Sequence, residues 1–264
     1  MNRGSLDRSL FSNGPALAWQ ERFDIALGTA RGLAYLHGGC EHKIIHCDVN
    51  RKNILLHDHF QAKISDFGLS KLLTPEQSSL FTTMRGTRGY LAPEWLTNSA
   101  ISEKTDVYSF GMVLLELVSG RKNCSLRSNS LMGLVYFPLF ALEMHEQGRY
   151  MELADPRLEG QVNNEEVEKL VRIALCCVHE EPVLRPSMAT VVGMLEGALP
   201  LSHPRNESLN FLRFYGRRFT EASMVDEENR QSDDDFMFFQ QENATTGSNT
   251  CFSYMSSQQI SGPR

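Results

Sequence analysis

Two polar stretches, HCDVNRKN at residues 46–53 and DFG at residues 66–68, decide the fold of this sequence. Two short apolar runs lie between them, Ile54-Leu55-Leu56 and Ala62-Lys63-Ile64. Short segments of this kind, bounded by polar loops, predict two strands of a hairpin. The hairpin therefore separates the two polar stretches and carries both.

The hairpin is expected to bring three polar side chains together. Asp48 and Asn53 precede its first strand, and Asp66 follows its second strand. Because adjacent antiparallel strands deliver these flanking loops to the same end, we expect Asp48, Asn53 and Asp66 to converge at one edge. Convergence of this kind is what metal-assisted chemistry requires.

Helices are predicted around this hairpin. The positions Trp19, Phe23, Ala26, Ala30, Leu33 and Leu36 follow three-to-four spacing and end at His37-Gly38-Gly39, which predicts one long helix. Apolar stripes predict three more helices, at residues 131–147, 165–179 and 187–197. The expected fold class is mainly α with a small β component.

Composition separates the chain into two parts. Periodic apolar residues fill residues 1–199, whereas Ser, Asn, Gln, Asp and Glu dominate residues 200–264. We therefore predict one folded domain over 1–199 and a disordered polar tail over 200–264.

Charge and cysteine content exclude several classes of function. The 264 residues carry a formal net charge of −6, so nucleic acid is not an expected partner, because phosphate binding needs clustered positive charge. The six cysteines form no regular framework, which favours reduced thiols in the cytoplasm. Neither a signal peptide nor a membrane-spanning segment is predicted.

Five motifs in order give the sequence a family resemblance. They are His46-x-Asp48-x-x-x-x-Asn53, Asp66-Phe67-Gly68, Ala92-Pro93-Glu94, the run Asp106-Val107-Tyr108-Ser109-Phe110-Gly111, and Arg185-Pro186. From Met1 to about Gly197 the sequence resembles the C-terminal, large lobe of eukaryotic protein kinases. Residues 86–95 and Cys47 resemble plant receptor-like serine/threonine kinases of the lectin-receptor type, whose kinase domains are the cytoplasmic part of plasma-membrane receptors.

The resemblance implies a function and a site. It implies ATP-dependent phosphoryl transfer to Ser or Thr of protein substrates, with Asp48 accepting the proton of the acceptor hydroxyl or orienting that hydroxyl. Asn53 and Asp66 would hold the Mg²⁺ ions on ATP, since oxygen ligands suit a hard cation. Leu55 would form part of the floor under the adenine.

Further residues receive structural roles from the same resemblance. Glu94 would pair with Arg185, Asp106 would hold the backbone of the 46–53 loop, and Thr87 would contact Asp48. Thr82 and Thr83 lie where phosphorylation typically orders the activation segment, residues 66–94. Cys47 stands where many kinases have the arginine that pairs with that phosphate, so we expect phosphorylation to control this site less.

The sequence departs from the family in two ways. Asn50 stands where the family usually has Lys, and Arg51 replaces the usual Pro; loss of a preorganised charge of this kind typically costs on the order of a hundredfold in rate. In addition, no Gly-rich loop or Val-Ala-Ile-Lys strand precedes the motifs, so the small lobe is missing from this sequence and weak ATP binding is expected.

Two interpretations stay open at this point. In the first, the chain is a truncated or incomplete copy of an active serine/threonine kinase. In the second, it is a catalytically inactive kinase-like lobe that binds partner kinases or their substrates. An in-frame Gly-x-Gly-x-x-Gly and Val-Ala-x-Lys upstream in the coding sequence would favour the first.

Overall fold

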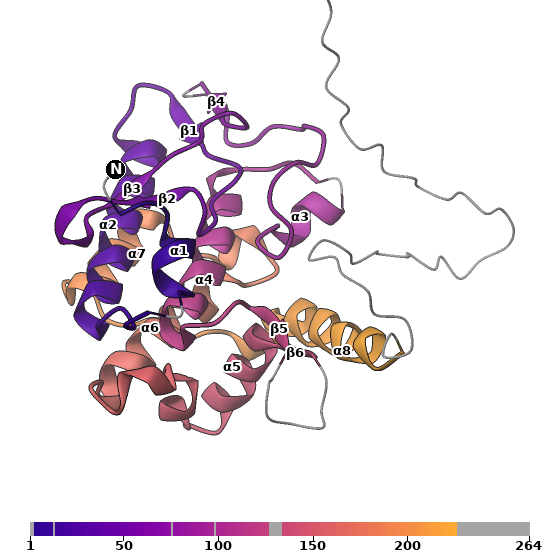
Figure 1. The fold of residues 1–264 in the computed structure, drawn as a ribbon. Helices are drawn as coiled ribbons and strands as arrows, with labels where there is room; N and C mark the ends of the chain where they lie inside the picture. The colour runs from indigo at the N-terminus through magenta and orange to yellow at the C-terminus, as the bar shows by residue number, and fades with distance from the viewer. Residues whose placement is uncertain (1–2, 13, 75, 98, 127–133, 226–264) are drawn as a thin grey trace, which may run out of the picture. The chain divides into compact units, whose positions relative to one another are not determined.

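A computed structural model describes residues 3–12, 14–74, 76–97, 99–126 and 134–225. Its helices are α1 (Leu6–Leu10), α2 (Trp19–Gly38), α3 (Pro93–Leu96), α4 (Glu103–Ser119), α5 (Phe137–Glu146), α6 (Asn164–Cys177), α7 (Met188–Glu196) and α8 (Asn210–Val225). The strands β1 (Lys43–Ile45), β2 (Ile54–Leu56), β3 (Ala62–Ile64), β4 (Lys71–Leu73), β5 (Cys124–Leu126) and β6 (Leu134–Tyr136) form two-stranded antiparallel pairs. The mainly α fold class is confirmed (Figure 1).

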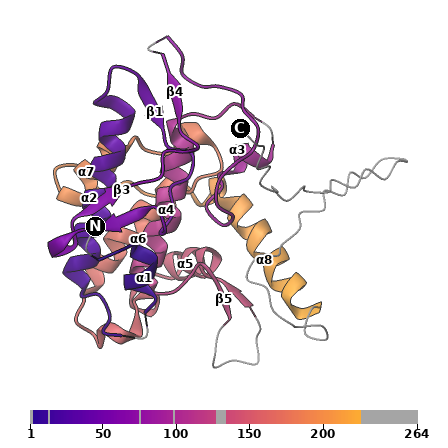
Figure 2. The ribbon, with the colours of Figure 1, turned by 45° about the horizontal axis from the view of Figure 1, so that its top comes forward.

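The predicted hairpin is present. β2 pairs with β3 in the register Ile54 to Ile64 and Leu56 to Ala62. β1 pairs with β4, so the segments on either side of the hairpin are joined as well; Figure 2 shows these two strands side by side. The loops that follow β1 and β3 are thereby held by two separate pairs of strands.

Helix α4 forms the centre of the core. It packs against both α2 and α6, and every residue from Thr105 to Ser119 is buried. The Ser102 hydroxyl caps its start by accepting a hydrogen bond from Lys104 N at 3.2 Å, and Gly120 ends it in the left-handed conformation at φ 62°. A helix that is buried on all sides fixes the position of everything attached to it.

Close approach between α4 and α6 depends on Gly111. A Cβ atom at this position would lie 2.7 Å from Val178 Cγ1, 2.8 Å from Cys177 Cβ and 3.0 Å from the Ala174 carbonyl oxygen. These distances are below van der Waals contact, so a larger residue would clash at this helix crossing and glycine fits.

The other predicted helices are present, with one error in position. The helices predicted at 19–38, 165–179 and 187–197 are confirmed as α2, α6 and α7. The prediction of one helix over 131–147 is wrong at its start, because residues 134–136 form β6 and the helix begins at Phe137; residues 131–133 lie outside the described residues. A short apolar run fits a strand or a helix equally well, and Pro138 in the first turn marks where the helix starts.

The prediction of a disordered tail from residue 200 is wrong for residues 206–225. These residues form a 3₁₀ turn (Asn206–Leu209) and α8. Leu209 and Leu212 are buried, and the Tyr215 ring meets the Tyr136 ring edge-on at 4.9 Å. A few well-spaced apolar residues therefore dock this helix within a segment that is polar on average, and residues 226–264 lie outside the described part.

None of the helices in the described ranges is both long enough and apolar enough to cross a membrane.

We expect Gly111→Ala to lower the free energy of unfolding by about 1–3 kcal/mol, because the added methyl group overpacks the α4–α6 crossing. Gly38→Ala is the matched control, since a Cβ at the end of α2 would meet nothing within 4 Å. Urea unfolding of the chain measures both. Equal stability of the two variants would contradict the close approach.

Candidate active site

A buried carboxylate holds the loop that carries the site. Asp106, at the start of α4, is fully buried and accepts hydrogen bonds from the backbone N–H groups of His46 at 2.8 Å and Cys47 at 2.9 Å. His37 Nε2 lies 2.9 Å from the same carboxylate. Cys47 has φ 66°, a conformation costly for a residue with a side chain, and these bonds secure it. The expected role of Asp106 is confirmed.

The Asp48 carboxylate is held through both of its oxygens. Oδ1 accepts hydrogen bonds from Thr87 N at 2.9 Å, Thr87 Oγ1 at 2.6 Å and Asn50 Nδ2 at 3.1 Å. Oδ2 accepts from Asn53 Nδ2 at 3.0 Å. The expected contact between Thr87 and Asp48 is confirmed. Asp48 itself is half-buried, and the Asn53 amide is the group that bonds Oδ2 within the described ranges.

Asn53 links the loop to the segment that carries Asp66. Its carbonyl oxygen accepts from Ser65 N at 2.9 Å and from Ser65 Oγ at 3.0 Å. Asp66 follows directly, exposed, with φ 62°. The structure thus brings Asp48 and Asn53 into direct contact and places Asp66 next to a residue bonded to Asn53.

The donor set around Asn53 suits magnesium held partly by phosphates. The Asn53 amide nitrogen is used on Asp48, which leaves Oδ1 as the atom that would coordinate the ion, and the exposed Asp66 offers a carboxylate. The described ranges hold no cluster of three or more His, Cys, Asp or Glu side chains that could bind a metal by themselves. Mg²⁺ commonly takes one or two protein oxygens together with substrate phosphates, so this set fits the ion.

Leu55 lies on β2, half-buried, opposite Lys63 on β3. A backbone bridge joins it to Ser5 at the start of α1. Its role under the adenine stays a prediction.

Arg51 is turned away from the site. Its guanidinium bonds Asp7 at 2.5 Å and Glu116 at 3.1 Å, and it also donates to the Tyr90 hydroxyl. Burial raises the pKa of Glu116 to about 6 even with this partner nearby. No pattern in the sequence indicates this network, because a charged residue in a polar loop is ordinarily exposed. Arg51 therefore cannot replace the lysine that the loop lacks.

Glu94 and Arg185 form the expected ion pair. Arg185 Nη1 and Nη2 donate to Glu94 Oε1 and Oε2 at 2.7 and 2.8 Å, and both side chains are buried. The Thr105 hydroxyl adds a third bond to Glu94 at 3.0 Å. This two-pronged pair attaches the end of the activation segment to the start of α4 and to the segment before α7.

Cys47 provides no charge to the activation segment. The side chain is buried, and burial raises the pKa of its thiol to about 12, so the thiol is neutral. Thr83 is exposed and Thr82 half-buried. A phosphate on either residue finds no cation at position 47.

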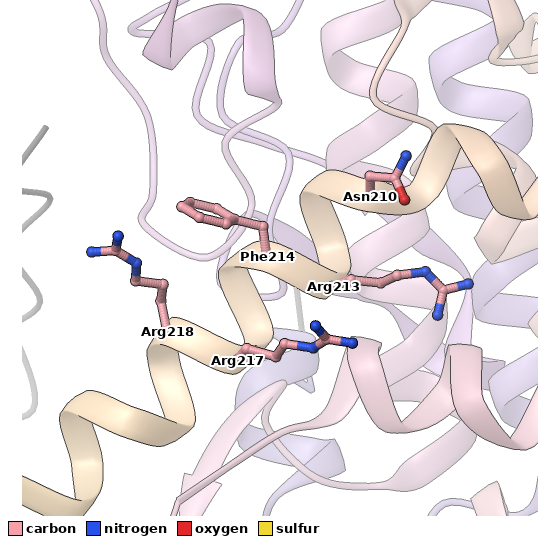
Figure 3. A pocket seen from close by; sticks show the side chains of 5 residues that line it. All are labelled: Asn210, Arg213, Phe214, Arg217 and Arg218. Atoms are coloured by element: carbon pink, nitrogen blue, oxygen red, sulfur yellow. The ribbon is translucent and has the colours of Figure 1, made fainter. Parts of the chain in front are cut away.

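A pocket on α8 lies outside this machinery. It is lined by Asn210, Arg213, Phe214, Arg217 and Arg218, and Figure 3 shows all five side chains coming from the one helix. Arg213 is paired with Glu146 at 2.5 Å, and the Arg218 guanidinium lies 5.2 Å from the Phe214 ring centre. None of the residues of the 46–53 loop lines it, so it has no part in the chemistry considered above.

Comparison with known proteins agrees with this geometry. The family model described as protein kinase domain matches residues 1–194. The chain is 69% identical to the G-type lectin S-receptor-like serine/threonine-protein kinase At5g35370 of Arabidopsis thaliana, over all of this chain and 32% of that protein. It is 47% identical to SD2-5 of the same description and organism, over all of this chain and 31% of that protein.

A rice relative extends the comparison beyond one organism. The G-type lectin S-receptor-like serine/threonine-protein kinase LECRK4 of Oryza sativa subsp. indica is 47% identical over 79% of this chain and 26% of its own length. The chain thus spans about a third, or less, of the length of these relatives. The motifs, the fold and these matches agree: the chain belongs to the protein kinase family and resembles, over its whole length, part of the plant G-type lectin receptor-like serine/threonine kinases.

Proposed function

We propose that this chain is the catalytic-loop part of a serine/threonine protein kinase that transfers a phosphoryl group from ATP to protein Ser or Thr. The observation that carries the proposal is the Asp48 carboxylate, fixed at Oδ1 by Thr87 and at Oδ2 by Asn53. A carboxylate fixed in this way can orient a hydroxyl and accept its proton.

The residues divide the work between them. Asp48 Oδ2 accepts the hydrogen bond of the acceptor hydroxyl and aligns its oxygen for attack. Asn53 Oδ1 and the Asp66 carboxylate hold Mg²⁺, and Leu55 contributes to the adenine floor. When bound, the metal ions supply positive charge that neutralises the ATP phosphates. Thr87 places the activation segment against Asp48, which favours an aliphatic hydroxyl as acceptor.

The substrates and the compartment follow from the same proposal. We assign protein substrates or partner kinases to the chain, with no nucleic acid among its partners, since its formal net charge is −6. We infer a cytoplasmic phosphoryl transfer, a proposal supported by the likeness to receptor-like kinases.

One observation favours a second function, that of an inactive kinase-like lobe that binds other proteins. Asn50 presents a neutral amide where the family usually has a lysine, and Arg51 is committed to Asp7 and Glu116. The transferred phosphoryl group then lacks one preorganised cation. A rate measurement separates the two functions.

Asp48→Asn in the natural protein that contains residues 1–264 is expected to lower kcat at least about a hundredfold, because the amide cannot accept the proton. Phosphate transfer to a Ser- or Thr-containing peptide measures it. Asp58→Asn, at an exposed carboxylate after β2, is the control and should keep the wild-type rate. A wild-type rate in Asp48→Asn would exclude the proposed role.

The double change Thr82→Ala, Thr83→Ala is expected to leave kcat within about threefold of wild type, because the buried, neutral Cys47 offers no charge to a phosphate at these positions. The same peptide assay, run on protein treated with and without phosphatase, measures this. Loss of activity in the double variant or after phosphatase treatment would contradict the expectation.

A further inference from the structure

Asn50 occupies the narrow space between Asp48 and Thr87. Its side chain is buried, with the residue 2% exposed. Its amide nitrogen donates to the Asp48 carbonyl oxygen at 3.0 Å, to Asp48 Oδ1 at 3.1 Å and to Thr87 Oγ1 at 3.0 Å. Its amide oxygen accepts from Lys52 N at 2.8 Å. Both ends of the amide are therefore in use.

These bonds fix the orientation of the amide. With the amide turned over, its oxygen would face the Asp48 carbonyl and carboxylate oxygens, and its nitrogen would face the Lys52 N–H, so both sides would be repulsive. Only the orientation with Nδ2 toward Asp48 gives every partner a favourable contact, with the two amide hydrogens shared among three acceptors.

The same bonds fix the hydroxyl of Thr87. Since Nδ2 can only donate, Thr87 Oγ1 accepts from it, and the single hydroxyl hydrogen is left to point at Asp48 Oδ1 2.6 Å away. Asn50, Thr87 and Asp48 thus form a closed ring of hydrogen bonds. Asn50 Nδ2 donates to the Asp48 main-chain oxygen and to Oδ1, and the N–H and O–H groups of Thr87 both donate to Oδ1. Within the described ranges, Oδ2 receives only the bond from Asn53.

No neighbouring cation of the described loop shares this role. The Arg51 guanidinium is bound by Asp7 and Glu116, and Lys52, whose side chain is exposed, meets Asn50 through its backbone N–H. Among the side chains of residues 50–52, the one that bonds Asp48 and Thr87 is the neutral amide of Asn50.

We propose that Asn50 is a positioning residue for phosphoryl transfer: its amide locks Asp48 Oδ1 and the Thr87 hydroxyl together, so that Oδ2 faces the acceptor hydroxyl. The proposal rests on the proposed function. It assigns to Asn50 the geometric part of the role of the usual lysine, without the charge. It also differs from the interpretation of Asn50 as a sign of lost chemistry, in which the residue does nothing for the rate.

Three substitutions at position 50 separate these interpretations. Asn50→Ala removes the amide, Asn50→Leu keeps a side chain of similar size but loses the donor, and Asn50→Lys keeps a donor and adds a charge. In the natural protein that contains this chain, we expect the first two to lower kcat about tenfold or more, because misplacement of a reacting group by about 1 Å costs up to about a hundredfold. KM for Mg-ATP should stay within about twofold of wild type, and Asn50→Lys should retain at least the wild-type kcat.

A double-mutant cycle tests the ring itself. Thr87→Val removes the hydroxyl; if Asn50 acts through Thr87, the double variant Asn50→Ala, Thr87→Val should lose no more than the larger single loss. Asn210→Ala is the matched control, since that side chain bonds only Glu207 O in the described structure and should leave kcat unchanged. Hydrogen exchange at residues 86–90 should rise in Asn50→Ala and stay at the wild-type level in Asn210→Ala.

Wild-type kcat in Asn50→Ala, or a rise in KM for Mg-ATP with kcat unchanged, would overturn the positioning role. Where the alanine variant fails to fold, Asn50→Leu decides the same question, because it fills the same space without a donor. If the wild-type rate is no higher than that of Asp48→Asn, the proposed function itself falls, and this proposal with it. An active wild type with an unaffected Asn50→Ala overturns the positioning role alone.

Discussion

The carboxylate of Asp106 is the constraint on which the rest of the site depends. It lies at the start of a helix that is buried on every side, and it accepts two backbone N–H groups from the 46–53 loop. A buried carboxylate without donors costs several kcal/mol, so the loop and the helix stabilise each other only in this one arrangement. The left-handed backbone at Cys47 persists for the same reason.

Hydrogen bonds between segments distant in the sequence then connect this loop to the activation segment. Asp48, fixed by its neighbours in the loop, orders Thr87, and Glu94 anchors the same segment to Arg185. The activation segment is therefore held near its end by two polar contacts, one at the site and one in the core. Neither contact needs a phosphate.

Much of this arrangement can be predicted from the sequence. The remaining parts cannot, and the reason in each case is physical. The β2–β3 hairpin follows from two short apolar runs, because that signal is local. Helix α8 and the turn before it do not, because their few buried residues, Leu212 in the helix and Leu209 in the turn, are diluted in a polar stretch. The sequence also does not indicate the direction of the Arg51 side chain, because tertiary packing brings its partners Asp7 and Glu116 to it.

The two unusual residues of the loop, Asn50 and Arg51, have opposite consequences for charge. Arg51 brings a cation, but Glu116 is 1% exposed and burial raises the pKa of its carboxyl to about 6, so this cation is drawn into the core to offset a buried acid. Asn50 brings no charge and keeps the geometry of Asp48. For the proposed transfer, residues 50 and 51 therefore preserve the position of the Asp48 carboxylate while adding no cation beside it, and electrostatic stabilisation of the transferred group has to come from other residues.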